Sequence, residues 1–269
     1  MRDVAGTVSL VTGGAGGIGA GVARRLAAAG SRVVVADVDD GPGQAVADEI
    51  GGAFLHCDVS RLTDSEAAVA LAVERFGGLD IAFLNAGVST GFSVGPDFDL
   101  ERYRRIMGIN LDGVVFGVQA ALPALRARGG GLIVATASLA GLTAMPLDPL
   151  YGANKHAVVG LVRGLGPALA REGITVQGLC PSFARTAIIA DLEEVFAAQG
   201  VAVLTVEEVV DGFWAAAMSE GSGECFTVVP GRALEPFRFR GVPGPRDASG
   251  AAAPALTPDA QVAEPGLAL

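Results

Sequence analysis

The sequence has few of the side chains that attach a protein to charged partners or cross-link it. Only 18% of its 269 residues are charged, and 19 Lys and Arg are outnumbered by 29 Asp and Glu, for a formal net charge of −10. Nucleic acids and anionic membranes attract basic surfaces, so we expect neither as a partner. The three cysteines, Cys57, Cys180 and Cys225, are far apart and not in metal-ligand spacing. This predicts reduced, buried thiols in a cytoplasmic protein without a bound metal.

The sequence also shows no pattern typical of a targeting sequence or of a transmembrane segment. Met1-Arg2-Asp3 leads directly into a strand-like run, so we expect no targeting leader. No apolar run reaches the ~18 residues that a bilayer span needs. Hydrophobic residues make up 51% of the chain, which excludes a disordered or fibrous protein. At ~100–200 residues per domain, the length fits one large domain or two small ones.

Short apolar runs alternate with longer amphipathic stretches along most of the chain. Strands that are almost wholly apolar must be covered on both faces, which is typical of a parallel sheet. Strand–helix alternation then predicts an α/β fold with one doubly wound parallel sheet. The predicted strands are 8–11, 32–36, 53–57, 81–84, 132–136, 175–180 and 224–229, and the predicted helices lie near 18–29, 41–50, 62–77, 99–128, 150–172 and 206–218.

Two segments stand apart from this alternation. The stretch 187–205 has a helical but poorly anchored pattern, and we interpret it as a candidate mobile lid. From Gly241 onward Gly, Pro and Ala dominate, and such a composition cannot bury a core. We therefore predict a single domain over 1–240 and a disordered or loosely draped tail over 241–269; a partner-contacting arm is the alternative.

A glycine-rich turn, TGGAGGIG, joins the first predicted strand to the first helix. Such a turn brings free backbone N–H groups and the positive end of a helix to one point, which suits a pyrophosphate. Glycine is needed because a Cβ would hold the phosphates away and block the turn. A phosphate-transferring P-loop is excluded, since no Gly-Lys-Ser/Thr sequence occurs. The predicted dinucleotide-binding residues here are Gly13, Gly16, Gly17, Ile18 and Gly19.

Asp37 ends the second predicted strand, eighteen residues after Gly19. A carboxylate in this position accepts hydrogen bonds from an adenosine ribose and repels a 2′-phosphate. Neither the next three residues nor the glycine turn contains a basic side chain. The pattern therefore favours NAD over NADP as cofactor, with a solvated acidic turn as the alternative interpretation.

Two later strand ends carry further candidate contacts. Asp58, followed by Val59, comes after the third strand and is placed to receive the adenine amino group, or to cap the strand end. Asn85, Ala86 and Gly87 follow the fourth strand, where small residues let the backbone pass close to a ligand, unless they form an ordinary turn.

The chain uses Lys once, at Lys155, and Tyr only at Tyr103 and Tyr151. On a helix Tyr151 and Lys155 are i and i+4, on one face. A free phenol, with a pKa near ~10, is a poor base at neutral pH, and an adjacent ammonium lowers that pKa. Ser138 ends the fifth strand, at the edge where open α/β sheets bind ligands. These three side chains predict a proton-transfer site; an exposed Tyr–Lys helix pair is the alternative.

The chain resembles the short-chain dehydrogenase/reductase family over about residues 5–230. The residues that carry this resemblance are the glycine turn, Asn85-Ala86-Gly87, Asn110, Ser138, Tyr151 and Lys155. The resemblance implies a Rossmann-type core, with Tyr151 as general acid/base and Ser138 polarising the substrate oxygen. It also implies that Lys155 contacts the nicotinamide ribose and lowers the Tyr151 pKa, and that Asn110 holds a water in a proton relay. It places Pro181 and Thr186 beside the nicotinamide. The chain departs from the family's usual pattern at Pro181-Ser182 and at Val229-Pro230-Gly231-Arg232, which alters the turn and the C-terminal wall of the pocket.

These observations predict an enzyme that transfers a hydride between NAD(H) and a secondary alcohol or its ketone, without a metal. The residues expected near the substrate are apolar, which favours a lipophilic alcohol: Leu139, Leu142, Met145, Phe183, Ile188 and Ile189. Two alternatives remain open, an NADP-linked carbonyl or ketoacyl reductase and a non-catalytic dinucleotide sensor. A methyltransferase would have no use for the Tyr–Lys pair.

The helices near 112–128 and 151–172 carry apolar residues around much of their circumference. One face of each covers the sheet, and a second apolar face would stay exposed on a monomer. We therefore predict a homo-oligomer, a tetramer or a dimer, in which these helices meet their symmetry mates about a two-fold axis.

Overall fold

The computed structural model describes residues 4–89, 91, 94–146, 148–241, 243–246 and 249. The chain divides into two compact units, Met1–Pro236 and Phe237–Leu269. The first unit contains the whole predicted alternation of strands and helices. The predicted tail, 241–269, lies largely outside the described residues.

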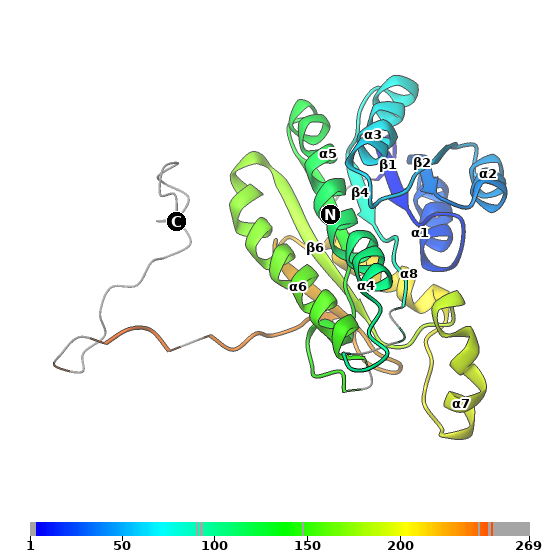
Figure 1. Cartoon of the computed structure of the whole chain (residues 1–269). Helices are drawn as coiled ribbons and strands as arrows, with labels where there is room; N and C mark the ends of the chain where they lie inside the picture. The colour runs from blue at the N-terminus through cyan, green and yellow to red at the C-terminus, as the bar shows by residue number, and fades with distance from the viewer. Residues whose placement is uncertain are drawn as a thin grey trace. The chain divides into compact units, whose positions relative to one another are not determined.

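The first unit is built on one eight-stranded sheet in the order β3-β2-β1-β4-β5-β6-β7-β8 (Figure 1). Neighbouring strands from β1 to β7 are parallel, and only β8 runs antiparallel, against β7. This confirms the predicted doubly wound parallel sheet and adds β8, which is too short to leave a pattern in the sequence. The strands are β1 (Val8–Thr12), β2 (Arg32–Asp37), β3 (Ala53–His56), β4 (Ile81–Leu84), β5 (Gly131–Thr136), β6 (Ile174–Pro181), β7 (Glu224–Val228) and β8 (Glu235–Pro236).

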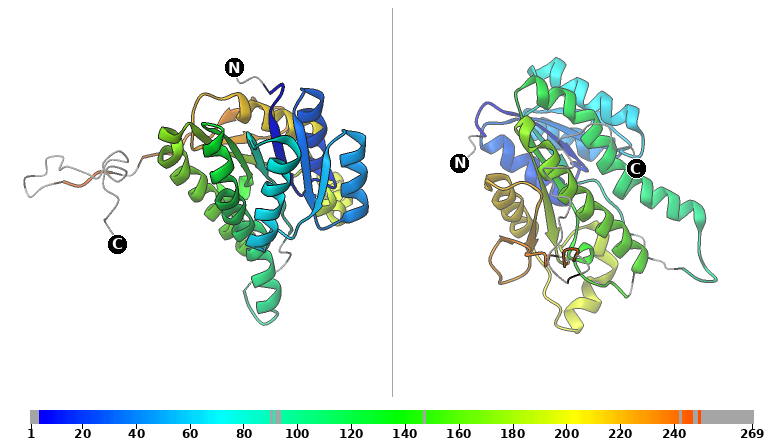
Figure 2. Two further views of the ribbon diagram at one scale, coloured as in Figure 1. Left: turned by 90° about the horizontal axis from the view of Figure 1, so that it is seen from above. Right: turned by 90° about the vertical axis from the view of Figure 1, so that its left-hand side faces the viewer.

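Helices cover the sheet on both faces, which explains why its central strands β1 and β4 are buried throughout (Figures 1 and 2). All five residues of β1 and all four of β4 are buried. Helices α1 and α8 pack against each other on one face, and α3 packs against α5 on the other. The helices are α1 (Gly17–Ala28), α2 (Asp40–Glu49), α3 (Leu62–Phe76), α4 (Leu100–Met107), α5 (Gly113–Ala127), α6 (Pro149–Leu169), α7 (Glu193–Ala198) and α8 (Val206–Met218).

The helix predicted over 99–128 is not uniform. Between α4 and α5 it widens into a π-helical turn, η1 (Gly108–Asp112). Such turns are rare and frequently mark functional sites, because they displace the i→i−4 hydrogen bonds. This turn is not predictable from the sequence, since the surrounding apolar periodicity is that of an ordinary helix.

The stretch Leu100–Ala127 is also long and apolar enough to cross a bilayer by length and composition, with a mean hydropathy of 1.3 over 18 residues. Our expectation that no segment reaches this length was therefore wrong. Packing inside the protein accounts for part of this apolar character, since 44% of the window is buried. Val114, Val118 and Ala121 are buried, and a Cβ on Gly117 would lie 2.5 Å from Leu84. Helix α5 thus covers β4 and α3 as a core helix does.

The predicted lid segment, 187–205, forms a 3₁₀ helix, η4 (Ala187–Leu192), and then α7. The C-terminal end of this segment, at Leu204, is held by hydrogen bonds that its sequence did not predict. The Leu204 N–H donates to Phe183 O (2.8 Å), the Arg185 N–H donates to Leu204 O (2.9 Å), and Leu204 is buried. The two ends of the segment are therefore held together beside β6.

Candidate active site

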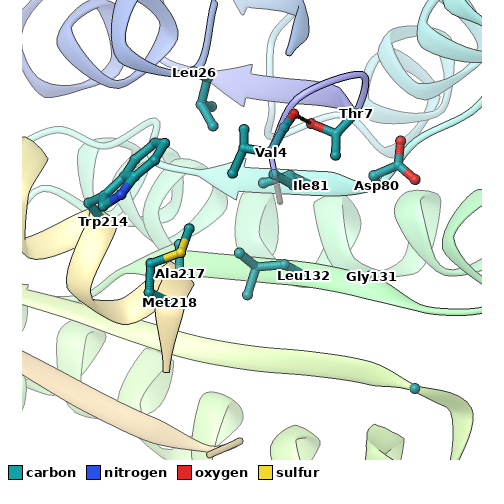
Figure 3. Close-up of a pocket in the computed structure, with 11 residues that line it drawn as sticks. Val4, Thr7, Leu26, Asp80, Ile81, Gly131, Leu132, Trp214, Ala217 and Met218 are labelled. Carbon is teal, nitrogen blue, oxygen red and sulfur yellow. Dashed lines mark hydrogen bonds between the residues drawn. The ribbon is translucent and has the colours of Figure 1, made fainter. Parts of the chain in front are cut away.

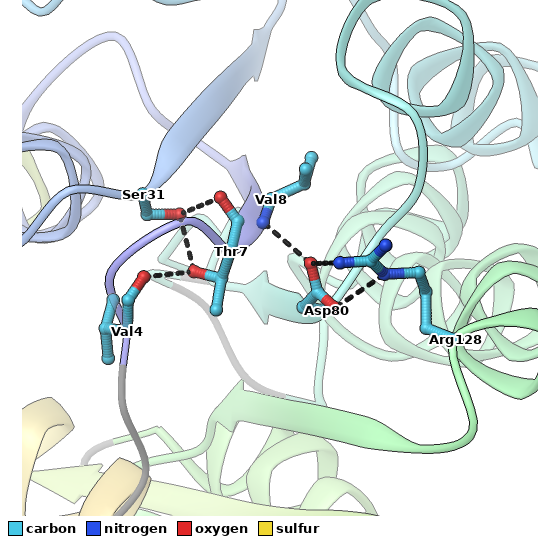
Figure 4. Close-up of polar contacts among 6 residues, drawn as sticks. All are labelled: Val4, Thr7, Val8, Ser31, Asp80 and Arg128. Carbon is cyan, nitrogen blue, oxygen red and sulfur yellow. Dashed lines mark hydrogen bonds and ion pairs between the residues drawn. The ribbon is translucent and has the colours of Figure 1, made fainter.

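A cavity of about 230 Å³ lies at the amino edge of the sheet (Figure 3). Apolar side chains line most of it, including Leu26 and Trp214. Its acidic residue, Asp80, is held in the structure: it accepts hydrogen bonds from the Val8 N–H (2.8 Å) and from Arg128 Nε (2.9 Å) (Figure 4). The cavity contains none of the predicted site residues, which instead follow the carboxyl ends of the strands.

The glycine turn has the geometry of an anion site. Gly13 has φ +64°, and a Cβ on it would lie 2.8 Å from Ala86 Cα; a Cβ on Gly19 would lie 2.0 Å from Gly13 O. Helix α1 begins after Gly16, which has no side chain to cap it, and no acidic residue occupies its first turn. Its N-terminal N–H groups and positive dipole end are thus available to a phosphate. Ile18 is half-buried against the core behind the turn.

Asp37, at the end of β2, is hydrogen-bonded to this turn. Its carboxylate accepts hydrogen bonds from the Ala15 N–H (2.9 Å) and the Asp39 N–H (3.1 Å). A carboxylate has about four lone-pair positions, so two bonds fix Asp37 and leave acceptors for ribose hydroxyls. The side chain is part-exposed at the carboxyl end of β2, as a ribose ligand must be.

The next two candidate residues, Asp58 and Val59, are held by contacts with neighbouring residues. Asp58 Oδ1 accepts hydrogen bonds from both the N–H (3.0 Å) and the hydroxyl (2.7 Å) of Ser60, which is the geometry of a strand-end cap. Val59 is buried, and a Cβ on Gly113 would lie 2.8 Å from it. An adenine contact from Val59 would therefore come from its backbone.

Asn85 connects the glycine turn to the strand that carries Ser138. Its Nδ2 donates to Thr12 O (3.2 Å), and its Oδ1 accepts from the Thr136 hydroxyl (3.1 Å). The Thr12 hydroxyl in turn accepts the N–H groups of Asn85 (2.9 Å) and Ala86 (3.2 Å). These contacts hold the carboxyl ends of β1, β4 and β5 in one fixed arrangement.

Ser138 and Tyr151 meet at the carboxyl end of β5. The Ala140 N–H donates to Ser138 Oγ (3.1 Å), and the Ser138 side chain is hydrogen-bonded to Tyr151. Burial raises the pKa of Tyr151, a hydrogen bond with Ser138 lowers it, and the Asp148 charge raises it. The net direction is opposite to the lowering expected from Lys155, because desolvation of the phenolate is the largest of these effects.

Lys155 lies behind this pair, buried within α6. Its Nζ donates to Thr136 O (2.9 Å) and lies 5.7 Å from the centroid of the Tyr151 ring. Burial lowers the pKa of Lys155 to about 8. A Cβ on Gly87 would lie 3.8 Å from Nζ, in ordinary van der Waals contact, so Gly87 adjoins this amine. The pair is therefore an internal one, and the alternative of an exposed surface pair is wrong.

Asp148 is a site residue that the sequence analysis missed. It is the N-cap of α6, where its carboxylate accepts the N–H of Tyr151 (2.9 Å) and that of Gly91 (3.1 Å). It thus fixes the start of the helix that carries Tyr151 and ties it to the loop after β4. The Asp-Pro pair at 148–149 was the available signal, since Asp favours the N-cap and Pro the first helical turn.

Both polar atoms of the Asn110 side chain are hydrogen-bonded to one neighbour. Its Oδ1 accepts the Val88 N–H (2.8 Å), and its Nδ2 donates to Val88 O (2.8 Å). These two bonds hold the loop after β4 against the π-helical turn that contains Asn110. A Cβ on Gly87 would lie 3.3 Å from Asn110 Oδ1, which brings this residue within the same cluster.

Thr186 lies beside the glycine turn, although the two are far apart in sequence. A Cβ on Gly17 would lie 3.3 Å from Thr186 Cγ2. Pro181 is buried at the end of β6, and the Ser182 N–H donates to Val228 O (2.9 Å), so the altered Pro-Ser turn is held to β7. In the part of the chain that the structure describes, no three His, Cys, Asp or Glu side chains are grouped to hold a metal ion.

Comparison with known proteins gives a consistent picture. The family model for short chain dehydrogenase matches residues 7–195. The chain is 39% identical over 192 residues to a 2,5-dichloro-2,5-cyclohexadiene-1,4-diol dehydrogenase of Sphingobium indicum, covering 70% of this chain and 77% of that protein. It is 38% identical over 192 residues to a cyclohexanol dehydrogenase of Acinetobacter sp., covering 70% and 76%. The crystal structure of a 3-ketoacyl-(acyl-carrier-protein) reductase from Brucella melitensis with NADH superposes with a TM-score of 0.78 at 28% identity, covering 86% of this chain and all of that one.

Proposed function

Because the chain belongs to the short-chain dehydrogenase family of oxidoreductases, we propose that it interconverts a cyclic secondary alcohol and its ketone with NAD as cofactor. One observation carries this proposal: Ser138, Tyr151 and Lys155 converge at the carboxyl end of β5, beside a glycine turn with an uncapped helix N-terminus. A dinucleotide sensor needs only the turn and has no use for the buried lysine. The ring-containing substrates named for two relatives favour a cyclic alcohol.

The residues of the turn fit a dinucleotide. The N-terminus of α1 would hold the pyrophosphate, Asp37 the adenosine ribose, and Asp58 with the Val59 backbone the adenine. Asn85, Ala86 and Gly87 would line its path along the sheet edge, and Lys155 would reach the second ribose. Pro181 and Thr186 would lie at its nicotinamide end, with Thr186 also adjoining Gly17 beside the pyrophosphate.

In the proposed reaction, Tyr151 Oη accepts the proton of the substrate hydroxyl. Ser138, which is hydrogen-bonded to Tyr151 in this structure, would turn its hydroxyl hydrogen to the substrate oxygen and hold that oxygen in place. Lys155, with a pKa of about 8, is positively charged at neutral pH, and this charge offsets part of the cost of ionising a buried phenol. When bound, the nicotinamide supplies the hydride acceptor. A water on the Asn110 carbonyl would carry the proton onward from the site.

The test of this function is reduction of NAD by a panel of cyclic and open-chain secondary alcohols, followed as NADH absorbance. A 3-ketoacyl thioester with NADPH belongs in the same panel, because a reductase of such substrates is a structural neighbour. We expect turnover of cyclic alcohols with NAD. Turnover restricted to the thioester and NADPH would replace the proposal with the reductase alternative.

The cofactor preference is expected to depend on Asp37. Replacing Asp37 with Ala and Val38 with Arg removes the charge that repels a 2′-phosphate and adds one that binds it. The double variant should shift the ratio of kcat/KM values for NAD and NADP by at least about 100-fold toward NADP, as a charge-assisted pair contributes about 1.5–3 kcal/mol in each direction. Asp39→Ala serves as the matched acidic control. A wild-type protein that uses NADP as well as NAD would contradict the role of Asp37.

The protein is expected to form a homo-oligomer through α5 and α6. On these helices Val114, Val118, Val158 and Val162 face the core. The opposite faces stay apolar: Val115 is exposed, and Leu122, Leu161 and Leu165 are half-buried. Light scattering at micromolar concentration should give four times the 27.0 kDa chain mass, or twice that mass for a dimer. Val115→Asp should lower the observed mass, whereas Val73→Asp on α3 should not; an active 27 kDa species would refute the assembly.

A further inference from the structure

One buried polar side chain on α6 has no role in the proposed reaction. Asn154 lies between Tyr151 and Lys155 in the sequence and is fully buried. Its Nδ2 donates a hydrogen bond to Met107 Sδ (3.2 Å), and a thioether is a weak acceptor. Its Oδ1 is buried and has no hydrogen-bond partner in the described part of the chain. An unpaired buried oxygen disfavours folding, so stability does not account for an amide at this position.

The place of Asn154 on α6 relates it to the reaction site. At about 3.6 residues per turn, Asn154 lies about 60° around the helix from Tyr151, and Lys155 lies about 40° away on the other side. Met107 is the last residue of α4 and directly precedes the π-helical turn η1, which α6 contacts (Figure 1). The contact between Asn154 and Met107 therefore joins the helix that carries Tyr151 and Lys155 to this turn.

This contact completes a closed ring of interactions around the site. Within η1, the Asn110 side chain exchanges two hydrogen bonds with the Val88 backbone (2.8 Å each). Gly87, the residue before Val88, adjoins the amine of Lys155, since a Cβ on it would lie 3.8 Å from Nζ. The ring leaves α6 at Asn154 and returns to it at Lys155. A shift of the π-helical turn against α6 would therefore change the surroundings of the amine.

Two other hydrogen bonds hold this part of α6, and neither restrains its rotation about the helix axis as directly. Asp148 accepts the Tyr151 N–H (2.9 Å) and fixes where the helix begins. Lys155 Nζ donates to Thr136 O (2.9 Å) at the end of a long, flexible side chain, which tolerates a small rotation. The side chain of Asn154 is short, so its contact with Met107 is lost when the helix turns.

Resting on the function proposed above, we propose that Asn154 is a positioning residue. Through Met107 it sets the rotation of α6 about its axis, and with it the place of the Tyr151 hydroxyl relative to Ser138. Asn154 itself takes no part in proton transfer. Its unfavourable burial is offset in function, because a displacement of about 1 Å at a reacting group can lower a rate by about 100-fold.

The variant Asn154→Leu separates this role from a structural one. Leucine keeps the branched shape and replaces both amide atoms with methyl groups, so the urea midpoint should be unchanged or higher. We expect kcat for alcohol oxidation to fall by at least about tenfold, whereas KM for the alcohol and the NADH affinity from fluorescence titration stay within about twofold. Ser65→Ala is the matched control: Ser65 Oγ, on α3, is also buried without a partner, and its removal should change neither kcat nor KM.

The variant Met107→Leu tests whether the thioether is the partner through which Asn154 acts. It removes the sulfur acceptor at a nearly conserved volume. This variant should lower kcat as well, and the double variant with Asn154→Leu should lower it no further than Asn154→Leu alone. Losses that multiply in the double variant would show that the two residues act independently, and would overturn the inference.

The single lysine of the chain provides a measurement that does not depend on turnover. Lysine labelled with ¹³C at Cε gives one side-chain NMR signal, that of Lys155. Asn154→Leu and Met107→Leu should both shift this signal, and Ser65→Ala should leave it in place. Shifted signals in a protein that oxidises no alcohol would support the positioning of Lys155 and would overturn the proposed reaction.

Three results would overturn the positioning role of Asn154 and leave the proposed reaction intact. The first is wild-type kcat in both Asn154→Leu and Asn154→Ala, and the second is a Lys155 signal that stays in place in both. The third is a joint loss of urea midpoint, NADH affinity and kcat in both variants, which would show a general loss of structure. Asn154→Ala is included because alanine cannot overpack the site, so the test does not depend on the folding of Asn154→Leu.

Discussion

Replacing Tyr151 with Phe is expected to lower kcat for alcohol oxidation by about 100- to 10,000-fold, the range that a positioned proton-transfer group contributes. The ring remains packed between Ser138 and the buried Lys155, so the site keeps its shape. Only the oxygen that accepts the substrate proton is lost. NADH affinity, measured by fluorescence titration, should therefore stay within about twofold of the wild-type value.

The chain supplies its own control for this substitution. Tyr103, on α4, is the only other tyrosine, and its ring packs against Phe98 with centroids 5.7 Å apart. Tyr103→Phe removes the same hydroxyl from a position without a proposed role in proton transfer, and kcat should be unchanged. A Tyr151→Phe enzyme that keeps more than about a tenth of wild-type kcat would rule out Tyr151 as the general base.

Replacing Gly19 with Ala is expected to destabilise the fold and abolish dinucleotide binding together. The added Cβ would lie 2.0 Å from Gly13 O, a backbone atom in the turn that cannot move aside as a flexible side chain does. The turn must open, and overpacking of this kind costs about 3 kcal/mol. Urea denaturation should show a lower midpoint, and NADH titration should show at least about a tenfold loss of affinity.

Substitutions at two other glycines distinguish the effect of a steric clash from the effect of losing the phosphate site. A Cβ on Gly41, in α2, has no neighbour within 4 Å, so Gly41→Ala should leave both stability and affinity unchanged or slightly improved. A Cβ on Gly16 also has no protein neighbour within 4 Å, but Gly16 is the N-cap of α1, where we place the pyrophosphate. Gly16→Ala should keep the wild-type denaturation midpoint and still weaken NADH binding; unchanged binding would remove the pyrophosphate from this turn.

The sequence by itself determined the fold class and the family, because both are recorded in local patterns. Apolar runs such as 8–11 and 81–84 must be covered on both faces, and this requirement alone leads to the parallel sheet that the structure contains. The glycine turn is equally local: strand, turn and helix are contiguous, so their order predicts the geometry around Gly13 and Gly19. The i, i+4 spacing of Tyr151 and Lys155 likewise needed only a helix to place both on one face.

Only the tertiary structure decided the electrostatics and the surroundings of the site, since these arise between residues far apart in the chain. Burial among β5, α6 and the loop at Gly87 sets the pKa of Lys155 at about 8 and raises that of Tyr151, against the lowering that spacing alone suggested. The pairing of Asn110 with Val88 depends on a π-helical turn that the apolar periodicity conceals. The site lies where β4 and β6 flank β5, and strand order is a long-range property that no single stretch of sequence encodes.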